Sequence, residues 1–170
     1  MKITCTLSSQ SLAAAAKQLR QYAASLPNKT EKLVRSMGEY GSEMALWHFN
    51  EKPHVKTGAT RDSIHYEHNG TRGTVFVGGA AVWIEFGTGV ARNGRTAGVY
   101  VHEKAAELGM DAIGTYGDGH GADPRGWYYY SADGTKHHTR GIESNPFMYK
   151  ASQDMRRELF DKAKEVFKTL

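Results

Sequence analysis

The sequence predicts an α+β fold, in which a small antiparallel β-sheet packs against N-terminal helices and a C-terminal helix. Apolar residues recur at spacings of three and four before residue 50 and again after residue 146, as on one face of a helix. The dipeptide Asn69-Gly70 is typical of a hairpin turn, because both residues tolerate positive φ. Residues 89–141 are rich in glycine and show little periodicity, which predicts a long inserted loop or hairpin.

Size and composition place limits on what the protein can be. The 170 residues fit a single domain spanning 1–170. The net charge of +4 is compatible with work near nucleic acid but is too small to establish contact. A lone cysteine excludes an internal disulfide. The N-terminus lacks the features of a signal peptide, and no apolar run reaches the roughly 20 residues that span a bilayer, so we expect no membrane association.

The first fifty residues predict one strand and two helices. Lys2–Leu7 alternates polar and apolar residues, which predicts a half-buried strand with Cys5 as a small buried residue. Ser9 or Ser11 can cap a helix that runs to Ala24 and ends at Pro27. A second helix begins at Asn28, with Glu31 completing a capping pair, and stops before Pro53. Its apolar face consists of Leu33, Met37, Tyr40, Met44 and Trp47.

The middle of the chain predicts the sheet. Thr57–Ile64 forms a turn that leads into a strand near Ile64–Glu67, and Thr74–Val77 is the returning strand. Ala80–Phe86 is apolar and favours one helical turn. Within the glycine-rich stretch, Trp127–Tyr130 and Thr135–Thr139 flank Asp133-Gly134, which predicts a protruding hairpin.

The last helix has a clear predicted start. Asn145 is placed to cap it, and Pro146 occupies the first-turn position that proline favours. Its apolar face comprises Met148, Met155, Leu159, Ala163, Val166 and Leu170.

Glu85 places a charge inside the apolar run Ala80–Phe86. One interpretation is a solvent-facing position on a short turn. The other is a carboxylate that pairs with an Arg or Lys, either of this chain or of a neighbouring copy. The residues alone leave both interpretations open.

No constellation of residues predicts catalysis, a cofactor or a metal. Four histidines fall in the glycine-rich stretch near Asp118 and Asp123, but tandem histidines on a strand face opposite ways, and no HExxH or CxxC element accompanies them. These histidines are His102, His120, His137 and His138. Asp62, Ser63 and His65 are adjacent in sequence, without the surroundings of a nucleophilic serine. The aromatic run Trp127–Tyr130 lacks interleaved basic residues, so it favours a protein contact over base stacking.

Three segments carry a resemblance to a known family. They are Thr57–Ile64, which is similar to "TGxLRxSI", Val82–Thr88, similar to "Y-hydrophobic-EFGT", and Asn145–Ala151, similar to "PFxxPA". In this order they resemble the tail-completion and head–tail joining family of long-tailed phages, related to the minor tail protein Z type of lambda-like phages. Thr60 and Lys150 depart from the family's usual leucine and proline, and residues 92–140 are longer than the usual connection.

The resemblance implies a virion structural protein rather than an enzyme, present in the host cytoplasm during assembly. It implies a ring of identical subunits at the neck or the top of the tail tube, in contact with the tube protein and neck or connector proteins and close to channel DNA. We expect the interface to include Trp83, Glu85, Phe86, Gly87, Thr88, Trp127, Tyr128, Tyr129, Tyr130 and Phe147. Two other interpretations are a nucleic-acid-binding module and a small metal-dependent hydrolase that uses the loop histidines.

Overall fold

The computed structural model describes residues 4–52, 58–87, 89–92, 95–97, 107, 127–139, 141–142 and 144–168. The chain divides into two compact units. The first unit comprises residues 1–43, 65–76 and 152–170, and the second comprises residues 44–64 and 77–151. Both combine helices with small antiparallel sheets, so the predicted α+β class is confirmed, whereas the expectation of one domain stays a prediction. Among the described residues, no helix combines the length and apolar composition that crossing a bilayer requires.

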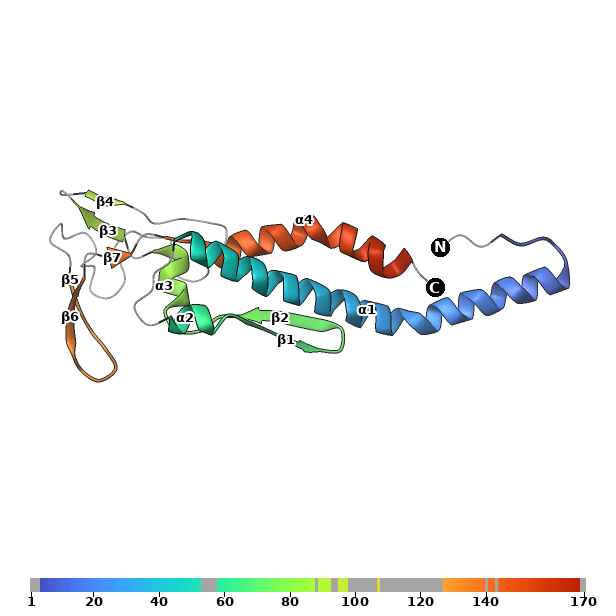
Figure 1. Ribbon diagram of the computed structural model, residues 1–170, viewed down its shortest axis with the longest axis horizontal. Helices are drawn as coiled ribbons and strands as arrows, with labels where there is room; N and C mark the ends of the chain where they lie inside the picture. The colour runs from blue at the N-terminus through green and yellow to red at the C-terminus, as the bar shows by residue number, and fades with distance from the viewer. Residues whose placement is uncertain are drawn as a thin grey trace. The chain divides into compact units, whose positions relative to one another are not determined.

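Four helices and seven strands are defined in the described residues (Figure 1). The helices are α1 (Ser9–Glu51), α2 (Ala59–Asp62), α3 (Ala81–Phe86) and α4 (Phe147–Lys168). The strands are β1 (His65–Asn69), β2 (Arg72–Phe76), β3 (Gly89–Arg92), β4 (Arg95–Ala97), β5 (Trp127–Tyr130), β6 (Lys136–Thr139) and β7 (Gly141–Ile142). All strand pairs are antiparallel, in the orders β1-β2, β4-β3-β7 and β5-β6.

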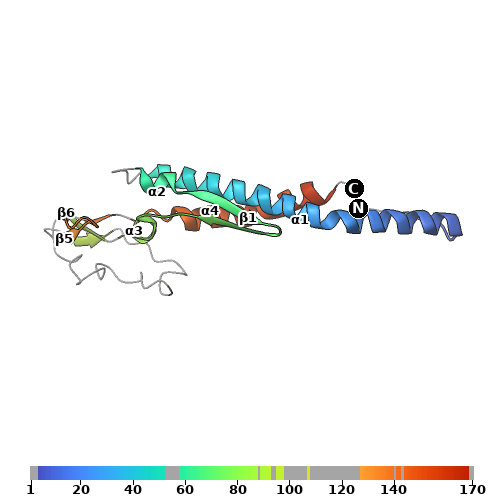
Figure 2. The ribbon, with the colours of Figure 1, turned by 90° about the horizontal axis from the view of Figure 1, so that it is seen from below.

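In the first unit, the β1-β2 hairpin and the later part of α4 both lie alongside α1 (Figures 1 and 2). The predicted Asn69-Gly70 hairpin is confirmed, because Asn69 pairs with Arg72 and Gly70 has φ 58°. The Tyr66 ring lies where a Cβ at Gly38 of α1 would be, and a Cβ at Gly73 would lie 2.8 Å from its Cε2 atom. Glycine at these two positions therefore lets the hairpin approach α1 closely, with the tyrosine ring between them.

The predicted helix break at Pro27 is wrong, because α1 continues through it from Ser9 to Glu51. Proline has no amide hydrogen, so the helix loses one hydrogen bond at this point. Nearby hydroxyl groups bond to backbone carbonyls, with Ser25 Oγ 2.7 Å from the Tyr22 oxygen and Thr30 Oγ1 2.9 Å from the Leu26 oxygen. The loss of one local bond does not end a helix whose neighbouring turns remain hydrogen-bonded on both sides.

The predicted N-terminal strand is also wrong within the described residues. Residues 4–7 have no regular structure, Cys5 is exposed, and residues 1–3 lie outside the described part of the chain. Alternation alone cannot form a strand when no neighbouring strand accepts its backbone hydrogen bonds. Ser8, rather than Ser9 or Ser11, caps α1, because its Oγ accepts a hydrogen bond from the Ser11 amide at 3.2 Å.

The two long helices bury faces that differ in part from the predicted ones. Met37 is buried as expected, but Trp47 is exposed, and Ala45 and Phe49 are buried instead. The buried side of α1 passes through glycine and alanine, which add little to an apolar pattern. In α4, Val166 is buried as predicted, Leu159 is largely exposed, and Leu170 lies outside the described residues.

The second unit has its core where the end of α1, α3 and the start of α4 meet. The buried cluster consists of Ala45, Phe49, Ala81, Ile84, Phe147 and Ala151. The predicted helical turn over residues 80–86 is confirmed as α3, and the hairpin around Asp133-Gly134 is confirmed as β5-β6.

Candidate functional site

The first of the three family-like segments contacts the residues that lead into α3. Thr60, in α2, is buried, and its Oγ1 accepts a hydrogen bond from the Ala80 amide at 3.2 Å. Ser63 follows α2, and its Oγ accepts a hydrogen bond from the Gly78 amide at 2.8 Å. Two hydroxyl groups of this segment therefore position the chain directly before α3.

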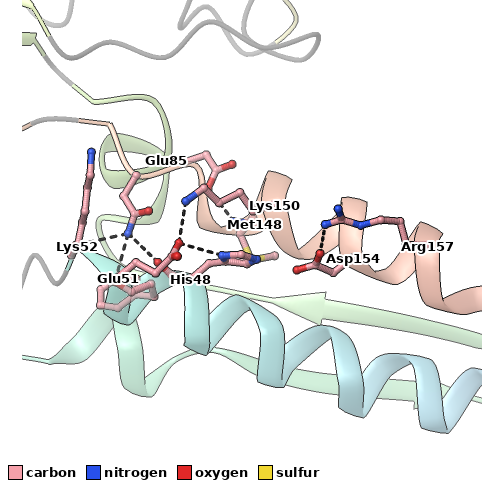
Figure 3. Close-up of polar contacts among 10 residues, drawn as sticks. His48, Glu51, Lys52, Glu85, Met148, Lys150, Asp154 and Arg157 are labelled. Carbon is pink, nitrogen blue, oxygen red and sulfur yellow. Dashed lines mark hydrogen bonds and ion pairs between the residues drawn. The ribbon is translucent and has the colours of Figure 1, made fainter.

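Glu85 of α3 is buried, so its interpretation as a solvent-facing residue is wrong. Its Oε2 accepts a hydrogen bond from the Met148 amide at 2.9 Å (Figure 3). Its Oε1 accepts one from the Tyr149 amide, also at 2.9 Å. These amides belong to the first turn of α4, where backbone donors have no partner within the helix. Glu85 therefore acts as the N-terminal cap of α4 and places its negative charge at the positive end of the helix dipole.

The pKa of Glu85 reflects two opposing influences. Burial, the larger one, raises the pKa of this carboxyl above its usual value. The hydrogen bonds from the Met148 and Tyr149 amides and the nearby charge of Lys150 lower it, without cancelling the effect of burial. The alternative interpretation, a pair with a cation, corresponds to the influence of Lys150, which lowers the pKa of Glu85 less than either of these two hydrogen bonds does.

Gly87 ends α3 in a backbone conformation that suits glycine alone. Its φ is 75° and its ψ is 161°, and its amide donates to the Trp83 carbonyl oxygen at 2.9 Å. A side chain at this φ and ψ would clash with the backbone. Gly87 therefore redirects the chain after α3, and Thr88, which follows it, lies outside the described residues.

Asn145 caps the end of α1 rather than the start of α4, so its predicted role is wrong. Its Nδ2 is 3.2 Å from the carbonyl oxygens of His48 and Phe49 and 3.4 Å from that of Lys52. The last carbonyls of a helix lack partners within it, and an amide NH₂ group can donate to them. The Asn145 amide also donates to the Ile84 oxygen at 2.7 Å, which links the segment before α4 to α3.

Glu51, Lys150 and His48 form a cluster of titratable side chains at this junction (Figure 3). Glu51 Oε2 lies 2.7 Å from Lys150 Nζ and 3.0 Å from His48 Nδ1. The hydrogen bond from Lys150 is the largest cause of the lowered pKa of Glu51, followed by that from His48. Lys150, in the first turn of α4, therefore pairs with the last turn of α1.

The predicted interface residues of α3 and α4 lie in two different environments. Phe86 and Phe147 are buried, and the Phe147 ring packs edge-to-face against Phe49 at a centroid distance of 5.2 Å. Trp83, by contrast, lies at the surface with 41% of its area exposed, next to the exposed Val82. In this group, Trp83 is the aromatic side chain that a partner could reach, while the phenylalanines support the α3–α4 junction.

The β5-β6 hairpin presents the other predicted interface residues. Tyr128 and Tyr130 are 58% and 68% exposed, and Lys136 Nζ lies 4.2 Å from the centre of the Tyr128 ring. Tyr129 stacks on His137 at 5.2 Å. The backbone of Trp127 pairs with Thr139. The hairpin thus carries aromatic side chains on both faces, and Lys136 lies beside Tyr128 on one of them.

The loop of this hairpin contains a polar cluster that the sequence did not reveal. Ser131 Oγ donates to Asp133 Oδ1 at 2.5 Å and lies 3.0 Å from His137 Nε2, and the Thr135 amide donates to Asp133 Oδ1 at 3.0 Å. The Ser131 hydrogen bond is the main cause that lowers the pKa of Asp133 to about 2. Asp133 contacts the serine rather than the histidine, so the cluster stabilises a turn and is not arranged as a catalytic triad.

Other candidate chemistry is not assembled in the described residues. In that part of the chain, no three His, Cys, Asp or Glu side chains converge as metal ligands would. His102, His120, Asp118 and Asp123 lie outside it. Asp62, Ser63 and His65, which lie close together in the sequence, contact different groups. Asp62 pairs with Arg61, the Ser63 hydroxyl accepts a hydrogen bond from the Gly78 amide, and His65 pairs with Glu67.

Comparison of the chain with protein-family models, with curated proteins and with solved structures gives no match in any of the three.

Proposed function

We propose that the chain is a virion structural protein of a tailed phage, a tail-completion or head–tail joining subunit that forms a ring with copies of itself and has no catalytic role. The observation that best supports the proposal is that, in the second unit, the second family-like segment bonds directly to the third, and the first bonds to the residues just before the second. Thr60 and Ser63 bond to the residues before α3, and Glu85 of α3 bonds to the start of α4. Segments far apart in the sequence thus come together in the second unit, as expected if together they define one protein family.

The exposed aromatic residues of the second unit support a role in assembly. Tyr128, Tyr130 and Trp83 expose large aromatic surfaces. Such residues are enriched in the cores of protein interfaces. In the proposed virion they would contact a neighbouring copy, the tail tube protein or a neck or connector protein, close to the DNA channel.

Deleting the encoding gene from the genome that carries it tests the proposal. We expect DNA-filled heads and separate tails by electron microscopy of lysates, because the joining subunit is missing. Complementation with the unchanged gene should restore joined particles. Joined, infectious particles from the deletion strain, or absence of the protein from purified virions, would contradict the proposal.

Matched variants in the complementation assay test the aromatic hairpin. Replacing Tyr128 and Tyr130 by serine should leave the chain folded but reduce the number of joined particles. Phe160→Ser is the control, because Phe160 lies in the first unit and has the same exposed fraction, 68%, as Tyr130. Equal complementation by the hairpin variant and by the control would show that the hairpin makes no required contact.

A nucleic-acid-binding module is the second candidate, and Lys136 beside the exposed Tyr128 ring favours it. A cation next to an aromatic face can engage a phosphate backbone while a base stacks on the ring. Binding to a single-stranded DNA oligonucleotide should then weaken steeply as salt rises. No binding at low salt would exclude this function.

A further inference from the structure

The β1-β2 hairpin leaves one edge of β2 without a partner strand. Among the described residues, β2 pairs with β1 alone, in a sheet of two strands. Residues of an antiparallel strand alternately turn their N–H and C=O groups towards the partner strand and away from it. Asn69 and Arg72 flank the two-residue turn and face each other, so Gly73 and Val75 direct their backbone groups away from β1. The outer edge of β2 therefore offers backbone donors and acceptors to a further strand.

An apolar groove runs along this edge, over α1 and between β2 and α4. Its volume is about 440 Å³. Five consecutive residues, 71–75, line it, and no described residue of β1 does. Side chains of consecutive strand residues point to opposite faces, so a groove lined by all five lies beside the edge of the strand and not under one face. Leu33 and Met37 of α1 and Met155 and Leu159 of α4 supply the rest of its apolar lining.

The groove has the length of a short extended segment. Residues 71–75 span about 13 Å, from about 3.3 Å per strand residue. A Cβ at Gly41 would lie 2.5 Å from Met155 Sδ and 3.1 Å from Val75 Cγ2, so the two walls converge over this residue of α1. At the other end, Thr71 is exposed and Leu159 is 47% exposed. An extended segment of about five residues therefore matches the groove.

The orientation of β2 sets the pattern of side chains that such a segment needs. Val75 faces α1, because its Cγ2 lies 3.1 Å from where a Cβ at Gly41 would be. A Cβ at Gly73 would also meet a side chain of α1. Arg72 and Thr74 therefore lie on the opposite, outer face of the hairpin. A strand beside β2 would place its apolar side chains on α1 and its polar ones next to Arg72 and Thr74.

The charge at the rim favours an acidic segment. Arg72 is the only charged residue among the described residues that line the groove. Within the described part of the chain, it forms no ion pair. Glu31, two residues before Leu33 on α1, is already 3.6 Å from Arg35 and 3.9 Å from His68. Opposite charges on neighbouring strands stabilise a sheet, so a carboxylate beside Arg72 would add to the affinity.

We infer that the outer edge of β2 binds an extended, acidic segment of a partner protein as a third strand. The segment exchanges backbone hydrogen bonds with Gly73 and Val75, places alternate apolar side chains on α1, and holds a carboxylate beside Arg72. Strand addition takes its affinity from backbone hydrogen bonds and its specificity from alternate side chains. The inference goes beyond the proposed function, because it concerns a surface of the first unit, whereas that function is argued from the second.

Peptide binding followed by NMR tests the inference. The probe is acetyl-Val-Thr-Val-Glu-Val-amide, added to the isotope-labelled full chain. We expect saturable shifts of amide signals, largest at Gly73 and Val75 and smaller at Arg72 and Thr74, whose amides face β1. Proline in place of the central valine removes a backbone donor and should weaken binding by roughly tenfold or more. No saturable shift, or equal binding of the proline peptide, would overturn the inference.

A charge exchange tests the role of Arg72. Arg72→Glu should weaken binding of the glutamate peptide by roughly threefold or more, and this variant should prefer the same peptide with lysine in place of glutamate. Arg20→Glu is the control, because Arg20 lies on α1 in the same unit and does not line the groove. The spread of amide signals shows whether each variant is folded. Equal effects of the two substitutions, or an unchanged preference for the glutamate peptide in Arg72→Glu, would contradict the inference.

Adjacent residues of α4 provide a second matched pair. Leu159→Ser makes the wall of the groove less apolar and should weaken binding of the probe. Phe160→Ser should leave binding unchanged, because Phe160 is 68% exposed and does not line the groove. Equal binding by the two variants would contradict the placement of the peptide in the groove.

Two further titrations test other occupants. Decanoate carries an apolar chain and a carboxylate but no amide, so it cannot add a strand. If decanoate shifts the Gly73 and Val75 signals at lower concentrations than the peptide does, the groove binds an amphiphile and the inference is overturned. If these signals change when the protein alone is concentrated, a second copy occupies the edge, and the inference is likewise overturned. The gene deletion does not bear on peptide binding, so failure of either proposal leaves the other standing.

Discussion

The two units of the chain are stabilised in different ways. In the first unit, the Tyr66 ring packs into the space above two glycines, and the polar contacts between hairpin and helix, such as Arg35 with His68 at 3.2 Å, are exposed. In the second unit, the buried Glu85 and Asn145 bond directly to helix ends. Exposed polar pairs contribute little, whereas buried hydrogen bonds are directional and costly to break. The close packing of the Tyr66 ring therefore stabilises the first unit, whereas directional hydrogen bonds to helix ends stabilise the second.

The largest expected effect tests the core of the second unit. Phe147→Ala removes a fully buried ring and its edge-to-face contact with Phe49. We expect a loss of about 3–5 kcal/mol in the free energy of unfolding. Hydrogen exchange resolved by residue should show the greatest loss of protection in residues 77–87 and 144–151. Equal loss throughout residues 65–76 would contradict the separation of the two units.

The next largest effect tests the close packing between the hairpin and α1 in the first unit. Gly38→Ala places a Cβ inside the Tyr66 ring, so the hairpin must shift. Although alanine favours a helix, we expect a net loss of about 1–3 kcal/mol in unfolding free energy, as for overpacked cores. The matched test is Gly38→Ala in a Tyr66→Ala background, where the added cost should disappear. A cost that persists without the ring would show that the close approach is not the reason for the glycine.

A smaller effect tests the hydrogen bonds from the start of α4 to Glu85 in the second unit. Glu85→Gln keeps one acceptor oxygen but turns an NH₂ group towards the second amide, so we expect a loss of about 1 kcal/mol at neutral pH. Because burial raises the pKa of Glu85, the folded state holds the proton more tightly than the unfolded chain does. The contribution of this proton to stability is present below pH 4.5, the ordinary value, and is lost as pH rises through the raised pKa. Denaturant titrations at several pH values should show this decline in the unchanged protein and not in Glu85→Gln.

The smallest effect concerns the exposed loop of the β5-β6 hairpin. The pKa of Asp133 is lowered to about 2, mainly by the Ser131 hydroxyl, so its contribution is present above the ordinary value of 3.8 and is lost as pH falls through about 2. The amide proton of Thr135, which donates to Asp133, should shift in NMR spectra over this acidic range. In Asp133→Asn the shift should be absent while the rest of the spectrum is retained. An unchanged titration in Asp133→Asn would show that another group causes it.

Sequence reasoning succeeded where local chemistry decides the structure. The turns at Asn69-Gly70 and Asp133-Gly134 lie where they were predicted, because their conformations depend on the turn residues themselves. It failed at Pro27 and at Lys2–Leu7 for the opposite reason. Whether a proline ends a helix depends on the stability of the turns around it, and whether an alternating segment forms a strand depends on a partner elsewhere in the chain.

The sequence indicates which segments belong to the candidate site, but not which atoms of those segments contact one another. Glu85 and Phe147, both expected at a subunit interface, are buried at the α3–α4 junction of this chain. The partner of Glu85, however, is a backbone amide 63 residues later, and Asn145 bonds to a carbonyl 97 residues earlier. Backbone groups are identical at every position, so no residue pattern indicates which of them a buried side chain will reach.

The conformation of Gly87 has a consequence for handedness. With φ 75° and ψ 161°, this residue lies close to the mirror image of an ordinary extended conformation. A D-amino acid favours that region as an L-amino acid favours its mirror image. A chain assembled by chemical ligation with D-alanine at position 87 should therefore keep the connection after α3, whereas L-alanine should distort it. At position 87, the fold therefore distinguishes between two residues that differ only in the configuration at Cα.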